Sequence, residues 1–374
     1  MKFGANISDK YKISHIEKGF KPLCFIKSDL LVFDNMSLFL MDLDNYSKIH
    51  ICDFKTTLKQ KLLYKSRLLT RLLRIEPRGV LNIDDNNVLI SFKGSIYHLN
   101  LKNKKLLSVH RFRNGMSAPL VLTSIKNIAG FDEQYCYGEY FSNHEKKEVK
   151  IYGCDKDLLK WRELYRFGKG EINHIHSIIP DSYNNRVWIF TGDFGNAAGI
   201  WYTEDNFKTV NRYLYGSQQY RSCVGFPTNN GLIYATDTPM ENNYIYIADS
   251  NKDIRKLFEL EGSSIYGMKM NNNYVFSTAV ERHSDGRQGK LSLLSYKRGL
   301  GIKSWYSQIV IGNLEEGFVT TAKFKKDLFP MALMQYGTIT FPSGNNPTNK
   351  IILYGSALKQ IDGHLLIIEK KTIN

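Results

Sequence analysis

His174 and His176 form the first group of residues whose types and spacing could do chemistry. They stand two residues apart in Asn-His-Ile-His, and side chains so spaced on a β-strand share one face, about 6.5 to 7 Å apart along the backbone. Three roles fit this pattern: proton transfer or substrate contact, a half-site for a divalent metal, or a structural hydrogen-bonded pair. We expect the first role. A divalent metal is the weaker alternative, and no other cofactor is expected.

Three acidic residues form a second group. Asp193 follows a strand-like run in Thr-Gly-Asp, Asp237 follows another in Thr-Asp-Thr-Pro, and Glu139 stands in Gly-Glu-Tyr-Phe. Glycoside hydrolysis ordinarily requires paired carboxylates, one protonated as the acid and one acting as base or nucleophile. An aspartate beside glycine or proline also caps turns. Three such residues together favour catalytic roles for Glu139, Asp193 and Asp237.

Tyr220 and Arg221 place a phenol and a guanidinium next to each other in the sequence. Neighbours on a regular strand face opposite ways, so both reach one pocket only if the segment bends or lies in a loop. Arg221 could clamp a carboxylate or sulfate through two hydrogen bonds, and Tyr220 beside a histidine could transfer protons in β-elimination from a uronic acid. The alternative is a structural pair of Arg221 with an aspartate.

Other polar and aromatic residues close to these groups are expected to bind substrate. Amide and carboxylate groups would bond sugar hydroxyls, and aromatic rings would stack on sugar faces. The predicted binding residues are Gln218, Glu241, Asn242, Tyr140 and Trp201.

Short strand-like runs must position all these residues. Runs such as RVWIFTGD and NYIYIADS alternate or are continuously apolar, and clusters of Asn, Asp or Gly separate them. They group about every 40 to 45 residues, the period of a four-stranded propeller blade. The sequence predicts an all-β fold, a single β-propeller domain over residues 1–374 with four-stranded antiparallel blades, and seven blades fit better than six. The predicted blades cover 21–55, 75–115, 126–168, 173–215, 221–260, 262–310 and 318–370.

A propeller would bring the candidate residues together. The innermost strands line the axis and the loops of one rim converge there, so three successive blades can place Glu139 through Asp237 around one axial pocket. The basic, leucine-rich segment 59–74 is the exception to the strand pattern. It predicts a short amphipathic helix with a solvated basic face, and binding to a membrane surface is the lesser alternative.

Two segments echo one another as strand, acidic turn and strand: IYGCDKDLLKWREL (151–164) and IWYTEDNFKTVNRY (200–213). In the second, Thr203, Asp205 and Thr209 fit the Asp-box pattern S-x-D-x-G-x-T-W, while Phe207 and Val210 replace its Gly and Trp. The first fits only with one residue inserted. The expected role of the aspartate is structural, because its carboxylate accepts hydrogen bonds from backbone N–H groups of the turn.

With these turns, the ordered series GEYF, HIH, RVWIFTGD, GSQQYR and TDTPMEN resembles the sialidase-like BNR/Asp-box repeat proteins found with bacterial surface-polysaccharide genes. The resemblance covers roughly residues 130–266. It implies a propeller that acts on a bacterial poly- or oligosaccharide, including acidic ones. True sialidases also carry an arginine triad, a tyrosine nucleophile and an Arg-Ile-Pro motif, and here only Arg74-Ile75-Glu76-Pro77 approximates the last.

Three functions remain open from the sequence. A glycoside hydrolase is preferred, with the three carboxylates as acid, base or nucleophile. The second is a polysaccharide lyase, in which His176 or Tyr220 removes the proton α to a uronate carboxylate and Arg221 neutralises the developing charge. The third is a propeller that binds a glycan or a protein without catalysis.

Composition and missing motifs argue against several classes of partner and of function. The net charge of +15 suits polyanionic partners, but the lysines are scattered and no nucleic-acid-binding motif occurs, so no nucleic acid is expected. No apolar run is long enough to span a bilayer, and the N-terminus does not resemble a secretory signal, which predicts a cytoplasmic protein. Five scattered cysteines indicate buried thiols. Phosphate-loop and Rossmann glycine motifs are absent, which argues against nucleotide hydrolysis and nicotinamide chemistry.

Overall fold

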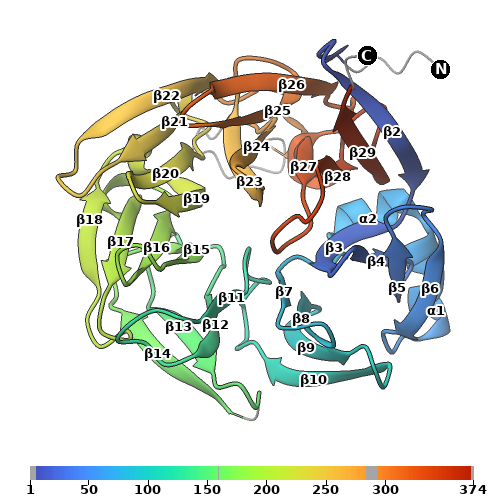
Figure 1. Ribbon diagram of the computed structural model, residues 1–374, viewed down its shortest axis with the longest axis horizontal. Helices are drawn as coiled ribbons and strands as arrows, with labels where there is room; N and C mark the ends of the chain where they lie inside the picture. The colour runs from blue at the N-terminus through green and yellow to red at the C-terminus, as the bar shows by residue number, and fades with distance from the viewer. Residues whose placement is uncertain (1–5, 159, 284–292, 372–374) are drawn as a thin grey trace. The chain divides into compact units, whose positions relative to one another are not determined.

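The computed structural model describes residues 6–158, 160–283 and 293–371. Seven antiparallel sheets of four or five strands make a single seven-bladed β-propeller (Figure 1). The all-β fold and the seven blades predicted from the strand period are confirmed. Residues 284–292, within the blade predicted for 262–310, lie outside the described residues.

The first blade contains β3 (Lys21–Ile26), β4 (Asp29–Asp34), β5 (Ser37–Asp42) and β6 (Lys48–Asp53), and the second contains β7 (Val80–Asn82), β8 (Asn87–Phe92), β9 (Ser95–Asn100) and β10 (Lys105–Arg111). The third blade contains β11 (Thr123–Ile125), β12 (Gln134–Gly138), β13 (Val149–Cys154) and β14 (Trp161–Phe167). The fourth blade contains β15 (His174–Asp181), β16 (Arg186–Gly192), β17 (Gly199–Thr203) and β18 (Asn211–Tyr215). The fifth blade contains β19 (Ser222–Thr228), β20 (Gly231–Thr236), β21 (Asn243–Ala248) and β22 (Ile254–Leu260). The sixth blade contains β23 (Ser263–Met270), β24 (Asn273–Ala279), β25 (Tyr306–Asn313) and β26 (Gly317–Lys325), with β1 (Asn6–Ile7) added to β26. The seventh blade contains β27 (Thr338–Thr340), β28 (Lys350–Ser356) and β29 (His364–Lys370), with β2 (Tyr11–Lys18) as its fourth strand.

The chain divides into two compact units. One unit comprises Met1–Glu76, Thr238–Tyr244 and Leu257–Asn374, and we call it the terminal unit. The other comprises Pro77–Asp237 and Ile245–Lys256, and we call it the central unit.

The core of the central unit lies between neighbouring sheets. Apolar side chains of β12 to β14 pack against those of β15 to β17, and Ile175 and Trp201 are among the buried members. Gly138 allows the close approach, because a Cβ added there would lie 2.3 Å from Cγ2 of Ile175. The backbone N–H of Ile175 then donates to the carbonyl of Glu139 at 3.0 Å. This packing fixes β15, the strand of the two histidines, against the preceding blade.

The turn after β17 has the hydrogen bonds expected of an Asp-box-like turn. Asp205 Oδ1 accepts from the backbone N–H of Thr209 at 2.9 Å, and Asp205 Oδ2 accepts from the Thr209 hydroxyl at 2.7 Å. The structural role predicted for Asp205 is confirmed.

Strands from both ends of the chain pair in the terminal unit. β2 lies antiparallel to β29, with Tyr11 opposite Lys370 and Lys18 opposite His364 (Figure 1). The outer strand of this blade therefore comes from the N-terminal region and its other three strands from the C-terminal region. The blade cannot form until residues more than 300 positions apart have met.

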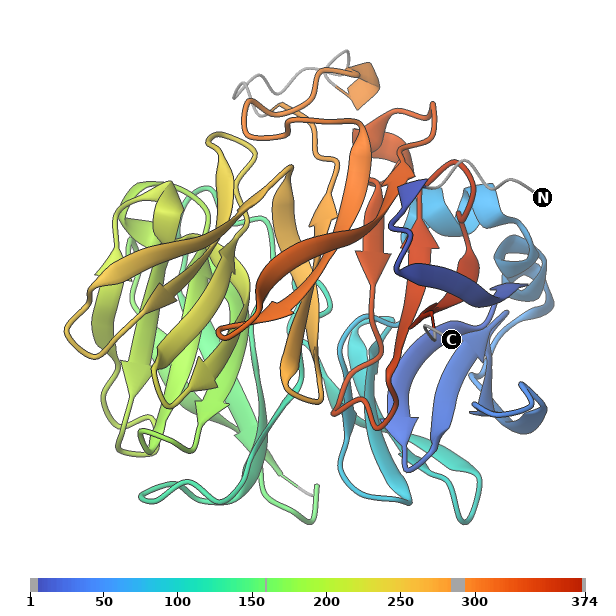
Figure 2. The ribbon, with the colours of Figure 1, turned by 45° about the horizontal axis from the view of Figure 1, so that its top comes forward.

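Two short helices replace the single helix predicted for 59–74. α1 (Leu58–Lys65) and α2 (Arg67–Leu73) meet at Ser66, whose side chain accepts a hydrogen bond from Leu69 N and so begins α2. A capping box between Thr57 and Gln60 begins α1. Both helices lie beside β3 to β6, as both views show (Figures 1 and 2). The short elements α3 (Met331–Met334), η1 (Gly195–Ala197) and η2 (Gln218–Tyr220) complete the helical structure of the described residues.

Candidate functional site

Two consecutive blades of the central unit place polar residues at equivalent positions. His174 at the start of β15 pairs with Gly192 at the end of β16, so Asp193 follows directly beside it. In the next blade Ser222 of β19 pairs with Thr236 of β20, and Asp237 follows. The prediction that both aspartates stand at strand ends is confirmed.

The same two strands carry equivalent β-bulges. In β15, Ile175 pairs with Thr191 and Ser177 with Phe190, which leaves His176 as the extra residue. In β19, Cys223 is the extra residue in the same way. A bulge turns a side chain away from its regular direction. His176 and Cys223 therefore both leave the ladder near the two aspartates.

The imidazole rings of His174 and His176 meet at their Nε2 atoms, 2.9 Å apart. Each Nδ1 atom faces a backbone carbonyl oxygen: that of Phe141 at 3.0 Å for His174, and that of Ser222 at 2.8 Å for His176. A carbonyl oxygen only accepts, so both Nδ1 atoms carry the hydrogen. In the neutral rings both Nε2 atoms are then proton-free and direct their lone pairs at one another.

Asp193 adds a third acceptor at the same point. Its Oδ1 atom lies 3.3 Å from Nε2 of His174, 3.5 Å from Nε2 of His176 and 3.2 Å from Nη2 of Arg221. Burial alone would raise the pKa of Asp193, but the charge of Arg221 opposes this effect and that pKa is held well below its usual value. Burial lowers the pKa of His174, although Asp193 opposes this shift.

The donor set fits a divalent transition metal. Two imidazole nitrogens and one carboxylate oxygen lie within 4.8 Å of one another, so a single cation placed among them could accept a lone pair from each. Because the pKa of His174 is lowered, a proton on that ring is a poor cation for this place. Imidazole and carboxylate together are ligands that Mn, Fe and Zn ions accept, and the Nδ1 bonds to carbonyls orient the rings as in known metal sites.

Arg221, Cys223 and Asp237 continue the cluster from His176. Arg221 Nη2 lies 3.6 Å from Asp237 Oδ2, and the Cys223 thiol donates to the same carboxylate at 3.2 Å. Asp237 is buried, and its Oδ1 atom has no hydrogen-bond partner among the described residues. His176, Cys223 and Asp237 form a second group of ligand atoms within 4.8 Å.

Tyr140 covers the histidine pair from one side. Its ring centroid is 4.5 Å from that of His174, and the Arg78 guanidinium lies over the Tyr140 ring, 4.9 Å from its centroid. Burial raises the pKa of Tyr140 despite the nearby charge of Arg78, so its phenol stays protonated at neutral pH. The ring is only partly buried and can meet a ligand.

The comparisons with known proteins identify the fold. No family model matches the sequence, and no curated protein matches it. Solved structures match over nearly the whole chain. An oligogalacturonate lyase in complex with manganese has a TM-score of 0.58 at 10% identity, covering 96% of this chain and 90% of that chain. An oligogalacturonate lyase from Vibrio parahaemolyticus has a TM-score of 0.56 at 8% identity, covering 94% and 90%. The WD40 propeller domain of Doa1 has a TM-score of 0.57 at 11% identity, covering 97% of both chains. At such identities the likeness shows the propeller fold alone.

The structure brings most of the predicted catalytic residues together but engages Glu139 elsewhere. The Glu139 carboxylate accepts two hydrogen bonds from Arg113, at 2.5 and 2.7 Å, and a third from Lys150 N at 2.9 Å. Tyr220 ends η2 just before Arg221. The sequence analysis required a bend or loop here if Tyr220 and Arg221 were to face the same pocket, and η2 is such an irregular segment.

The predicted binding residues lie in different places. Gln218 is buried and donates to the backbone carbonyl of Asp193 at 2.8 Å, so it supports the cluster. Trp201 is buried in the core and its indole N–H donates to Thr191 at 3.0 Å. Glu241 and Asn242 are exposed in the segment 238–244 of the terminal unit.

Sequence reasoning missed the cluster's contributions from Cys223 and Asn173. Cys223 follows Arg221 by two residues, a spacing that could have placed it in the same group. Asn173, just before His174, accepts from the backbone N–H of Asp193 at 2.8 Å. Because Asn173 directly precedes His174 in the sequence, that position could have indicated that it belongs to the same group.

Gly192 gives the cluster the space it needs. A Cβ at this position would lie 2.4 Å from Cε1 and 2.5 Å from Nε2 of His176, so Gly192→Ala must displace the ring. We expect a loss of about 1–3 kcal/mol in the free energy of unfolding, measured by urea denaturation, with weakened metal binding. Gly168→Ala is the matched control, because its Cβ would make no contact closer than 3.4 Å. Equal stability of the two variants would contradict this packing.

Proposed function

We propose that this protein is a divalent-metal-dependent enzyme that cleaves an acidic oligosaccharide by β-elimination. The observation that carries the proposal is the convergence of three proton-free ligand atoms, Nε2 of His174, Nε2 of His176 and Oδ1 of Asp193. The likeness in fold to an oligogalacturonate lyase in complex with manganese supports the same class of substrate and metal. The resemblance of residues 130–266 to propellers encoded with polysaccharide genes also agrees with a glycan substrate.

The two histidines and Asp193 would hold the metal, with Nδ1–H bonds to carbonyls keeping the rings in place. When bound, the metal would supply a Lewis acid for the uronate carboxylate and make the α-proton more acidic. Arg221 stands 3.2 Å from Asp193 and can pair with the substrate carboxylate as negative charge develops there. Its side chain remains 11% exposed, which leaves it within reach of a ligand.

Two tyrosines would carry out the proton transfers, one as the base and one as the acid. In β-elimination the α-proton leaves to a base, the C–O bond at the β-carbon breaks, and the leaving oxygen takes up a proton. Tyr140, whose raised pKa keeps its phenol protonated, would donate that last proton. Both ring nitrogens of His176 are engaged, so we propose Tyr220, the other base that the sequence suggested, and its phenol must lose its own proton before it takes up the α-proton.

Glycoside hydrolysis, the reaction preferred from the sequence, has less support. It requires one carboxylic acid that stays protonated near neutral pH. The pKa of Asp193 is held far below that range by the charge of Arg221, against the effect of burial. The Glu139 carboxylate is occupied by Arg113 and Lys150.

The test is to incubate the metal-stripped protein with oligogalacturonate, with and without Mn²⁺, and to record ultraviolet absorbance. Elimination creates an unsaturated sugar that absorbs in the ultraviolet, and hydrolysis creates none. We expect an absorbance increase that requires Mn²⁺, and at least about a hundredfold loss of rate in Arg221→Gln. New reducing ends without absorbance would favour the hydrolase, and binding without cleavage would favour a glycan-binding propeller.

Tyr140→Phe and Tyr220→Phe separate the two proton-transfer roles. Each is expected to lower kcat by about 10²–10⁴-fold, because a positioned acid or base contributes that much. Mn²⁺ affinity should stay the same in both, since neither tyrosine belongs to the proposed ligand set of His174, His176 and Asp193. A variant that turns over as fast as the wild type would remove that tyrosine from the mechanism.

A further inference from the structure

The helices α1 and α2 of the terminal unit have their leucines on the outside. Every leucine from Leu58 to Leu73 is exposed, with fractions from 36% to 82%. Leu58 and Leu62 stand one turn apart on α1, and α2 has two such pairs, Leu68 with Leu72 and Leu69 with Leu73. Rows of exposed leucines on both helices are unusual for a protein surface that meets only water.

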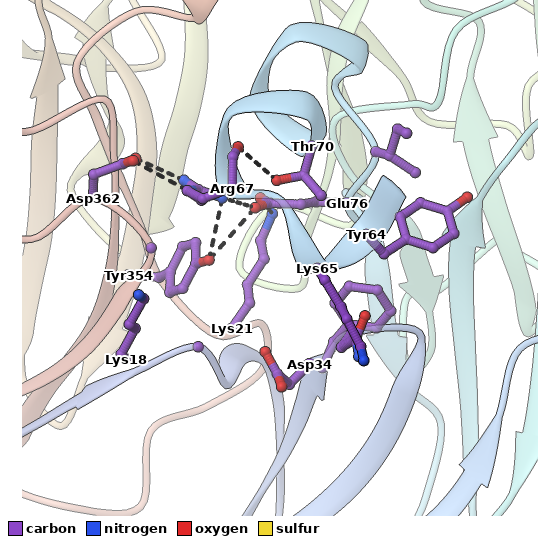
Figure 3. A pocket seen from close by; sticks show the side chains of 15 residues that line it. Lys18, Lys21, Asp34, Tyr64, Lys65, Arg67, Thr70, Glu76, Tyr354 and Asp362 are labelled. Atoms are coloured by element: carbon purple, nitrogen blue, oxygen red, sulfur yellow. Dashed lines mark hydrogen bonds and ion pairs between the residues drawn. The ribbon is translucent and has the colours of Figure 1, made fainter. Parts of the chain in front are cut away.

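Polar side chains attach α2 to the rest of the unit instead. Arg67 pairs with Glu76 and, at 2.8 Å, with Asp362, as Figure 3 shows. Arg71 is almost fully buried and pairs with Asp327 at 2.7 Å. The charged face of α2 therefore points inward and its apolar face outward, so the solvated basic face predicted for 59–74 is wrong for α2, whereas the α1 lysines Lys59, Lys61 and Lys65 are exposed as predicted.

The exposed charges between the leucines are all positive. Lys55, Lys59, Lys61, Lys65 and Arg74 are exposed, and residues 54–75 contain no Asp or Glu. Lys65 also lines a cavity of about 300 Å³ together with Lys18, which is exposed as well. The surface thus combines apolar rows with an excess of positive charge, although the exposed Asp53 lies close enough to Lys61 to interact with it.

Further apolar residues extend this surface from the segment that binds Arg71. Leu328 is 84% exposed, and Phe329 lies beside Arg71, with the guanidinium 5.4 Å from its ring centroid. The ion pair between Arg71 and Asp327 holds this segment against α2. Leu328 and Phe329 therefore lie beside α2, on the side of the helix that carries Arg71.

We propose that α1, α2 and the segment at Leu328 and Phe329 dock on the surface of an anionic lipid bilayer. Leucines would enter the boundary between headgroups and acyl chains while the lysines meet the negative surface, as in interfacial amphipathic helices. Lysine is depleted at the centres of protein–protein interfaces, which makes a protein partner the poorer fit. In the described residues no helix has the length and apolar character needed to cross a bilayer.

Flotation of the full chain with lipid vesicles tests this docking. We expect binding to phosphatidylcholine vesicles that contain about 30 mol% phosphatidylglycerol, little binding to pure phosphatidylcholine, and at least about tenfold weaker binding at high salt. The variant with Leu58→Gln, Leu62→Gln and Leu73→Gln should lose at least about tenfold in partitioning. Lys59→Gln with Lys61→Gln should lose a similar factor, on anionic vesicles only.

Leu107→Gln is the matched control, because Leu107 is 59% exposed on β10 and lies outside this surface. It should bind vesicles like the wild type. Circular dichroism of each variant checks that the fold is kept. Failure of the wild type to bind anionic vesicles overturns the proposal, as does full binding by the triple glutamine variant. A leucine-dependent dimer without vesicle binding would assign the surface to a second copy of this chain and also overturn it.

Discussion

Replacing His176 with alanine should lower the affinity for Mn²⁺ at least about a hundredfold and remove Mn²⁺-dependent elimination with it. The substitution deletes one of three ligand atoms and leaves the lone pair of His174 Nε2 and the Asp193 carboxylate with weaker attraction for a cation. Isothermal titration of the metal-stripped protein with Mn²⁺ measures the affinity, and the ultraviolet assay measures the rate.

His144→Ala is the control for this variant, because His144 is exposed and belongs to neither ligand group. It should bind Mn²⁺ like the wild type. The pH dependence supplies a second check. The lowered pKa of His174 keeps its ring neutral to lower pH, so protonation of His174 should weaken Mn²⁺ binding only below the ordinary histidine pKa of about 6.5. Unchanged Mn²⁺ binding in His176→Ala would refute the proposed ligand set.

The propeller could be predicted because its blades are local. Each blade is a run of strands joined by short turns, so the repeat of strand-like segments is visible along the chain. The pairing of β2 with β29 was not visible in this way. Tyr11–Lys18 alternates apolar and charged residues, and its partner strand lies more than 300 residues away.

The helical segment shows the same limit. Its leucine spacing predicted helix, but the sequence could not say which face turns inward. That choice depends on Asp327 and Asp362, which pair with Arg71 and Arg67 across more than 250 residues. The ion pairs, rather than the leucines, attach the helix.

The site was partly predictable for a similar reason. Asp193 and Asp237 end strands in consecutive blades, so their equivalent positions follow from the repeat. The contact of the two histidine rings, with their Nε2 atoms 2.9 Å apart, depends on the β-bulge at His176. No residue type in this part of the sequence predicts that bulge. The Glu139 carboxylate pairs with Arg113, which lies just after β10 of the preceding blade. No motif in the sequence marks Arg113 as its partner.

Glu76→Gln should destabilise the protein by about 3 kcal/mol at pH 7, an effect that shrinks as the pH falls. The Glu76 side chain is 15% exposed, pairs with Lys21 at 2.9 Å and also pairs with Arg67 (Figure 3). Burial alone would raise the pKa of Glu76, but these two cations lower it to about 2. Urea unfolding of both proteins at several pH values measures the difference.

The sign of the pH effect follows from that lowered pKa. Because the folded protein holds Glu76 ionised to a lower pH than the unfolded chain, the carboxylate stabilises the fold above about pH 4.3, its ordinary pKa. This contribution declines below that value and is lost as the pH passes 2. The difference between wild type and Glu76→Gln should therefore be roughly halved at about pH 3. Glu145→Gln, at an exposed glutamate paired with Lys147, should leave stability unchanged throughout. A difference that stays constant from pH 7 to pH 3 would mean that Glu76 stabilises the fold by packing and not through its charge.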